Sequence, residues 1–214
     1  MLTGIHDFAL FVIAGVLLNL TPGPDMTYIA ARAASGGFRD GLAATAGITS
    51  GCMVHTFAAA AGLSALLAAS ATAFEIVKWI GAAYLAYAGV RQIVAAARSR
   101  EAATSRPVLR AADHWRVYRE AVLINVLNPK VALFFLAFVP QFIAVDAPAK
   151  PLAFLLLGCV FNFNSLFTNV PVAWLASRAS GRIRGDGSAA RWLRGTVGAL
   201  FVGMAARLAL ATRQ

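Results

Sequence analysis

Two short polar stretches interrupt long apolar segments of this chain, and each stretch carries one charged residue. The first reads Asn-Leu-Thr-Pro-Gly-Pro-Asp over residues 19–25, and the second reads Asn-Val-Leu-Asn-Pro-Lys over residues 125–130. The carboxylate of Asp25 can bind a cation or take up a proton, and the ammonium of Lys130 can bind an anion. Because charged side chains inside apolar segments are costly, they indicate a functional site by default. We therefore treat the two stretches as parts of one candidate binding site.

The prolines predict that a helix breaks at each stretch. A proline lacks the backbone donor and collides with the preceding turn, so the helix must kink or unwind. We expect Thr21 to cap a half-helix that starts at Pro22, and Asn128 to cap one that starts at Pro129. Inside a membrane an unwound backbone is tolerated only against protein or beside a water-filled cavity. Both breaks are therefore expected to border a cavity.

The position of Lys130 calls for an anionic partner. A cation in the first turn of a helix opposes the helix dipole, and a buried unpaired ammonium costs roughly several kcal/mol. The partner is either Asp25 or an anionic group of a ligand. Two alternatives stay open: Lys130 could extend to the membrane interface, and Asp25 could be an interfacial charge at a helix start.

The composition predicts an all-α, polytopic membrane protein. Of the 214 residues, 59% are hydrophobic and 13% are charged, and the mean hydropathy is +0.70. So little polar surface cannot enclose a soluble core. Apolar segments near the ~20 residues that cross a bilayer lie at residues 8–34, 41–70, 74–97, 121–143, 152–176 and 192–211. We therefore expect six transmembrane helices, of which the first and the fourth are broken.

The arginines predict the orientation in the membrane. The net charge of +10 arises mainly from basic residues after the first helix, between the third and fourth, and between the fifth and sixth. By the positive-inside rule these loops are cytoplasmic and both termini are outside, although Arg207 and Arg213 run weakly against it. The few aromatic residues of these loops lie at helix starts, which argues against nucleic-acid binding.

The chain divides into two halves of three helices each. The basic segment 98–119 reads as a cytoplasmic linker between residues 1–97 and residues 120–214. Since three is odd, the second half must insert with the opposite orientation. Inverted repeats that begin with discontinuous helices are the plan of many secondary transporters, whose substrate site lies where the breaks meet. The sequence is also compatible with a homo-oligomer.

Other residues of the apolar segments suggest packing. Gly37, Gly41, Gly47 and Gly51 recur with small residues between them, and glycines four apart let membrane helices approach closely, so we expect all four to serve packing. His55 could relay protons or bond to a neighbouring helix. On the fifth helix, Asn162 and Asn169 share one face with further polar residues. This face either makes interhelical hydrogen bonds or lines the cavity, and the sequence does not decide between the two.

If the breaks converge, the site is complementary to a zwitterion. Amides and Lys130 can receive a carboxylate, while Asp25 can receive an ammonium. Burial favours the neutral form of a carboxyl group and a bound cation favours the charged form, so Asp25 could couple export to proton entry. The candidate substrate-binding residues are Asn19, Thr21, Pro22, Gly23, Pro24, Asp25, Asn125, Asn128, Pro129 and Lys130.

Three other functions fit the residues less well. A cation or metal exporter would need several converging carboxylates, histidines or thiolates, and the membrane segments offer mainly Asp25, His55, Cys52 and Cys159. An enzyme would need a nucleophile and base or a metal motif, and no such spacing occurs. A purely structural membrane protein would not need a charge at both breaks. We expect neither a metal nor a cofactor.

Several motifs together resemble one known family. They are Thr21-Pro22-Gly23-Pro24, the spacing Gly37/Gly41/Gly47/Gly51, Gly62-Leu63, Gly81-Ala82-Ala83-Tyr84-Leu85, Asn125-x-x-Asn128-Pro129-Lys130 and Val139-Pro140-Gln141-Phe142. With this set, the first four helices resemble the LysE/RhtB family of amino-acid exporters. The remaining helices agree in number and hydropathy.

The resemblance implies a multi-pass exporter of amino acids or related small metabolites in a bacterial inner membrane, driven by the proton gradient without an organic cofactor. It assigns both Pro-containing breaks to the transport pathway, whereas Asn19 and Asp25 rest on the physical argument above. The chain departs from the family pattern at Ala121 and Ala205, where glycine is common, and in its asparagine-rich fifth helix. That helix leaves the identity of the substrate open.

Overall fold

The computed structural model describes residues 3–65, 71–98, 113–144 and 146–178, together with a few positions between 195 and 206, and these residues form an all-helical structure. The elements are α1 (Phe8–Leu20), α2 (Pro24–Gly36), α3 (Phe38–Ala58) with a π-helical extension η1 (Ala59–Leu63), α5 (Ala71–Arg98), α6 (His114–Val126), α7 (Pro129–Leu133), the π-helical η2 (Phe134–Phe138), the 3-10 helix η3 (Val139–Phe142) and α8 (Lys150–Arg178). The all-α prediction is confirmed for the described residues.

Within the described residues, two helices are long and apolar enough to cross a membrane, namely 38–63 and 150–178. Two further spans result if each broken helix counts as one. The axis bends by 52° between α1 and α2 and by 46° between α6 and residues 129–142. The predicted third span coincides with α5, which is not among these candidates, and the predicted sixth span and most of the linker lie outside the described residues. The six-span plan therefore stays a prediction.

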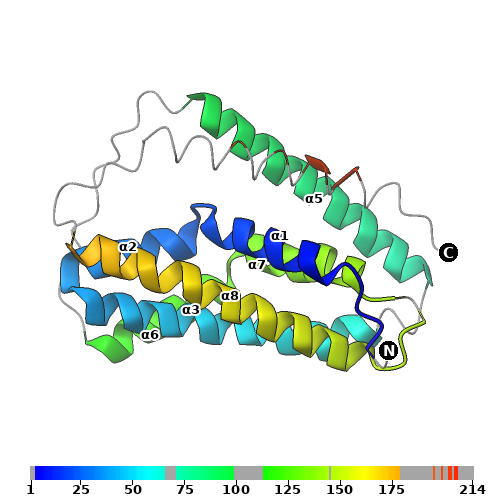
Figure 1. Ribbon diagram of the computed structural model, residues 1–214, viewed down its shortest axis with the longest axis horizontal. Coiled ribbons are helices and arrows are strands. Elements are labelled where there is room, and N and C mark those ends of the chain that lie inside the picture. Colours follow the sequence, from blue (N-terminus) through cyan, green and yellow to red (C-terminus); the bar gives the residue numbers. More distant parts are fainter. Residues whose placement is uncertain are drawn as a thin grey trace.

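The helices lie lengthwise beside one another (Figure 1), and α3 packs against α2, α6 and α8, while α5 contacts η2. The α1–α2 and α6–α7 segments run in opposite directions (Figure 1). The first begins beside the N-terminus and the second begins at the other end of the bundle. This is the relation that inverted repeats require.

Glycines of α3 set its distance from α6. A Cβ atom at Gly47 would overlap the main-chain oxygen of Tyr118 and lie 2.6 Å from the Cβ of Ala121. At Gly51 it would lie 2.8 Å from the Cβ of Asn125. The backbone of α3 therefore touches the half-helix that leads into the second break.

The predicted packing role is confirmed for Gly47 and Gly51, and also for Gly41, whose Cβ would lie 2.8 Å from that of Ala173. It was wrong for Gly37, where a Cβ would meet nothing within 4 Å; there the φ angle of 83° in the turn between α2 and α3 favours glycine.

Two apolar clusters fill the bundle on either side of the breaks. One is rich in aromatic residues and includes Phe11, Phe134, Phe138 and Phe161. The other is built from small and aliphatic residues of α2, α3, α6 and α8, such as Ile29. Large apolar side chains of other positions face outward, as lipid contact requires; they include Leu127, Phe163 and Phe167.

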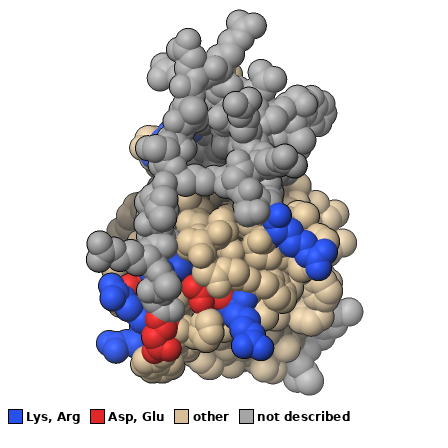
Figure 2. All heavy atoms as spheres, turned by 90° about the vertical axis from the view of Figure 1, so that its left-hand side faces the viewer, with Lys and Arg blue, Asp and Glu red and all other residues tan. Residues whose placement is uncertain are grey.

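Charged side chains gather at the end of the bundle where α2 ends and α6 begins (Figure 2). Exposed arginines of the described helix ends contribute to it, namely Arg39, Arg116, Arg119 and Arg178. These are residues of the basic segments for which the sequence predicts a cytoplasmic position. Below we refer to this end of the bundle as the charged end.

Replacing Gly47 by alanine should loosen the contact between α3 and α6. Alanine favours a helix by about 1 kcal/mol over glycine, but overpacking costs about 1–3 kcal/mol, so we expect a lower midpoint of thermal unfolding in detergent. The matched control is Gly62→Ala, because a Cβ at Gly62 meets nothing within 4 Å. Equal midpoints for the two variants would contradict the close packing.

Candidate functional site

The first break lies between α1 and α2, and its caps differ from the prediction. Thr21 does not cap the following half-helix. Instead it ends α1: its main-chain N–H donates to the carbonyls of Leu17 and Leu18, and its hydroxyl donates to Leu17 at 2.8 Å. Gly23 precedes α2 and Pro24, not Pro22, takes the first helical position. The reason is that a proline disfavours helical geometry in the residue before it, so Pro24 keeps Gly23 extended and no helix can run from Pro22 through Gly23.

The second break is formed as predicted. Asn128 caps the half-helix that begins at Pro129, and its side-chain oxygen accepts the main-chain N–H of Lys130 at 3.0 Å. The residues before it close α6, since the N–H of Leu127 donates to Leu123. The break is therefore only Leu127 and Asn128 long.

The two breaks lie against each other. The ammonium of Lys130 donates to the main-chain oxygen of Thr21 at 2.9 Å. The side-chain amide of Asn125 donates to Oδ2 of Asp25, also at 2.9 Å. The second break therefore supplies both hydrogen-bond donors, and the first break supplies both acceptors. The convergence expected from the sequence is present in the structure.

Lys130 satisfies its charge in a way that the sequence did not predict. We expected a direct anionic partner, whereas the ammonium bonds to a carbonyl that is left unpaired where α1 ends. Asp25 attracts it electrostatically. An ammonium has three N–H donors, of which Thr21 takes one, so Lys130 can also bind a ligand. Since it bonds to the opposite break, Lys130 does not extend to the interface.

A pocket lies between the breaks and contains half of the predicted site residues. Those that line it are Asn19, Thr21, Asp25, Asn125 and Lys130. The glycine, the prolines and Asn128 shape the backbone around it. The space that the centre of a water molecule can occupy measures about 20 Å³, which is room for roughly one water. The structure is therefore closed around the site.

Residues outside the two stretches complete the pocket wall. The apolar ones are Leu18, Met26, Ile48, Cys52, Val131 and Phe161. Two polar residues of α8, Ser165 and Asn169, also line it, so part of its polar face borders the cavity. Asn162 instead bonds to the sulfur of Met53 and to Gly158. The α8 spacing indicated this face, whereas no sequence signal distinguished the apolar wall residues from ordinary core.

Three atoms of the pocket wall are buried without a hydrogen-bond partner in the described part of the chain. They are the Nδ2 atom of Asn19 and the Oδ1 atoms of Asp25 and Asn125. Leaving such an atom unpaired costs about 1–3 kcal/mol, so each needs an explanation. A pocket that accepts a polar ligand provides one.

His55 supports the second break from behind. Its Nε2 atom lies 3.1 Å from the main-chain oxygen of Asn125. Its ring stacks on Phe135 with a centroid distance of 6.1 Å. This agrees with the prediction of a histidine bonded to a neighbouring helix. His55 therefore helps to fix the position of Asn125.

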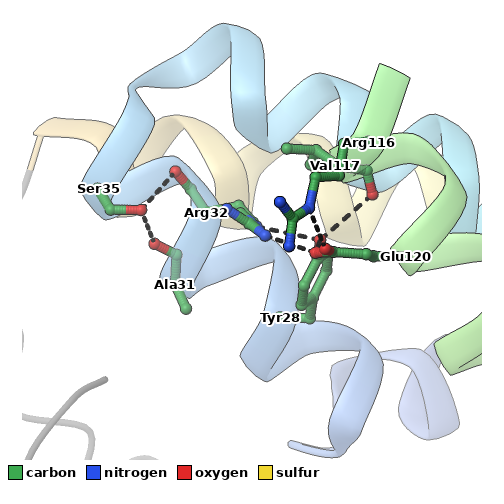
Figure 3. A network of polar contacts seen from close by, with 7 residues as sticks. All are labelled: Tyr28, Ala31, Arg32, Ser35, Arg116, Val117 and Glu120. Atoms are coloured by element: carbon green, nitrogen blue, oxygen red, sulfur yellow. Dashed lines mark hydrogen bonds and ion pairs between the residues drawn. The ribbon is translucent and has the colours of Figure 1, made fainter. Parts of the chain in front are cut away.

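A network of polar contacts, which we call the polar layer, joins α2 and α6 (Figure 3). The hydroxyl of Tyr28 donates to Glu120 at 2.7 Å, and Nε of Arg32 donates to that hydroxyl at 3.0 Å. Arg32 also pairs directly with Glu120 and is only 5% exposed. Tyr28 lies about one turn beyond Asp25. The layer thus holds α2 against α6. The sequence analysis did not predict it, because Arg32 was grouped with the basic residues that follow the first predicted helix.

Aromatic rings close the pocket on the other side. Phe161 lines the pocket and lies 4.4 Å, between ring centroids, from Phe134. Phe134 also stacks on Phe138 at 4.8 Å, and Phe11 joins them from α1.

Comparison with known proteins finds relatives of similar length. The chain is 34% identical to an uncharacterized membrane protein of Pseudomonas aeruginosa, with 98% of this chain and 97% of the relative covered. It is 31% identical to the homoserine/homoserine lactone efflux protein of Salmonella typhimurium, with 94% and 95% covered. It is 27% identical to the leucine efflux protein of the same organism, with 96% of each chain covered. No solved structure matches.

The two Salmonella relatives are named as efflux proteins, which are not enzymes. Their names do not favour the metal-exporter alternative. Within the residues that the structure describes, no group of three or more histidine, cysteine, aspartate or glutamate side chains could hold a metal ion. The sequence model of the family described as LysE type translocator matches residues 16–212, which is most of the chain. The chain therefore belongs to the LysE-type translocator family, as its motifs predicted.

Proposed function

We propose that this protein is a secondary transporter that exports amino acids or related small zwitterionic metabolites across a bacterial inner membrane in exchange for protons. One observation carries the proposal: a carboxylate from one helix break and an ammonium from the other border the same buried pocket. The relatives named as leucine and homoserine efflux proteins support it.

In the proposed site the ten break residues have two roles: some contact the substrate, and the others shape the backbone around it. Lys130 and the side-chain amide of Asn19 receive the substrate carboxylate, and Asp25 receives the substrate ammonium. The prolines, Gly23 and Asn128 keep the two backbones unwound, so that these groups reach the pocket. No cofactor takes part.

The proposed architecture is six spans in two inverted repeats, with residues 1–97 and 120–214 joined by a cytoplasmic linker at 98–119. The opposite directions of the two broken helices support this arrangement (Figure 1). The charged end faces the cytoplasm and both termini lie outside, as the arginine distribution favours. Lipid surrounds the bundle.

Proton coupling follows from competition at Asp25. Asn125 occupies one carboxylate oxygen, and the second oxygen is buried and unpaired. A proton and a substrate ammonium both need this oxygen, so binding one displaces the other. Lys130 and His55 are the other titratable groups that act electrostatically on Asp25. Such exclusive binding is what exchange of protons for substrate requires.

Alternating access requires the pocket to open toward one end at a time. The Tyr28–Arg32–Glu120 layer blocks the path to the charged end, and the aromatic cluster blocks the opposite path. The two barriers differ in chemistry. Ion pairs and hydrogen bonds hold the polar layer together, whereas packing between rings holds the aromatic cluster together. We propose that loading from the cytoplasm separates α2 from α6 at the polar layer.

The proposal is tested with liposomes that contain the full-length protein and are loaded with labelled amino acids. We expect efflux faster than in protein-free liposomes, and faster still when a pH gradient drives protons inward. In Asp25→Asn the pH dependence should disappear, because the amide cannot take up a proton. Asp146→Asn, which changes an exposed carboxylate, should behave as the wild type. A pH dependence that persists in Asp25→Asn would remove Asp25 from coupling.

Replacing Lys130 by methionine should weaken substrate binding through the carboxylate. A charged hydrogen bond is worth about 1.5–3 kcal/mol, so we expect affinity to fall by about 10- to 100-fold in a binding titration. The control is Lys150→Met at the start of α8, because its ammonium donates to the main-chain oxygen of Ala147 and does not line the pocket. If Lys130→Met and Lys150→Met bound equally well, Lys130 would have no role in recognition.

Weakening the polar layer should open the pocket toward the charged end. In a Cys159→Ser background the pocket thiol of Cys52 is the remaining cysteine, and its labelling rate by a small thiol reagent reports access. Glu120→Gln removes a charged hydrogen bond worth about 1.5–3 kcal/mol. We expect labelling at least about tenfold faster, with Asp146→Asn unchanged. An unaltered rate would show that the layer does not limit access.

A further inference from the structure

The unpaired atoms of the pocket define a pattern of donors and acceptors. Asn19 offers one N–H donor, while the Oδ1 atoms of Asp25 and Asn125 offer two acceptors. Lys130 adds a further donor, since Thr21 uses only one of its three. A ligand that satisfies this set must carry N–H donors on one side and acceptor oxygens on the other.

The head group of an α-amino acid matches this pattern. Its ammonium can donate to Asp25 and to Asn125, and its carboxylate can accept from Asn19 and from Lys130. Every unpaired atom of the wall is then satisfied. In this arrangement the two charges of the pocket are both used by the head group, which leaves neither of them for the substrate's side chain.

The rest of the wall carries no further charge. Of the pocket-lining residues in the described part of the chain, Asp25 and Lys130 alone are charged. Around them lie apolar side chains such as Ile48 and Phe161, with the neutral polar groups of Ser165 and Asn169 on α8. Nearby, Glu120 is paired with both Arg32 and Arg116 in the polar layer, outside the pocket wall.

We infer that the site selects α-amino acids with neutral side chains and rejects those with a charged side chain. A lysine, arginine, aspartate or glutamate substrate would bring a third charge into a buried site without a partner, which is strongly unfavourable. A neutral aliphatic side chain would contact the apolar wall. A hydroxylated one could bond to the hydroxyl of Ser165 or the amide of Asn169 on α8. The inference rests on the proposed function and adds the substrate class.

The test is inhibition of transport in liposomes that contain the full-length protein. The neutral probes are L-alanine, L-valine, L-leucine and L-homoserine, and the charged probes are L-lysine and L-glutamate. L-leucinamide and 4-methylpentanoate each lack one charge of the head group. We expect the best neutral amino acid to bind at least about 100-fold more tightly than either charged one, and more tightly than both head-group analogues.

The outcomes separate the two proposals. If lysine or glutamate bound within tenfold of the best neutral amino acid, the inference on substrate class would be overturned while amino-acid export stood. If no amino acid bound or moved, both proposals would be overturned. Binding of leucinamide or 4-methylpentanoate as tight as leucine would overturn the head-group arrangement.

A charge added to the wall should change the selection. Ile48 is 3% exposed and lines the pocket, so Ile48→Asp supplies a partner for a cationic side chain. We expect the affinity for lysine relative to leucine to rise at least about tenfold. Ile48→Asn, which has nearly the same shape without the charge, should leave the ratio unchanged. Should Ile48→Asp fail to fold, the wild-type comparison decides the inference by itself.

Discussion

The structure depends on the mutual satisfaction of two interrupted helices. A helix that stops inside a membrane leaves main-chain carbonyls without partners, and hydrocarbon offers none. Here the carbonyl at the end of α1 receives the ammonium of Lys130, and the carboxylate that opens α2 receives the amide of Asn125. Together they satisfy each other and leave a small polar pocket between them.

Packing of the other helices holds this arrangement in place. Gly47 and Gly51 bring α3 against α6, and His55, one turn after Gly51, bonds to the main chain of Asn125. On the other side α8 supplies Ser165 and Asn169 to the wall. Gly47 and Gly51 therefore affect the site, because the position of Asn125 depends on how closely α3 approaches α6.

The sequence was informative wherever a residue type is chemically incompatible with a continuous apolar helix. Prolines predicted both breaks, and the two opposite charges predicted that the breaks would meet. The predicted cap of the first break was wrong because there are two prolines, and the second, Pro24, keeps Gly23 extended, so that the helix begins at Pro24 and not at Pro22. For the second break, a single proline left no such choice, and the predicted cap at Asn128 was confirmed.

Other features depend on pairing between distant segments, which one sequence does not display. Arg32 lies near a helix end with other basic residues, and only the fold shows that it is buried against Glu120. The apolar pocket wall resembles ordinary core until α3 and α8 are placed around the breaks.

The central claim is that the pocket between the two breaks binds a zwitterion by its two charges. The most direct measurement is an experimental structure of the protein in a lipid environment with bound L-leucine. The account predicts the ligand between the breaks, with its ammonium on Asp25 and Asn125 and its carboxylate on Lys130 and Asn19. A ligand bound elsewhere in the bundle, or breaks that do not touch each other, would contradict it.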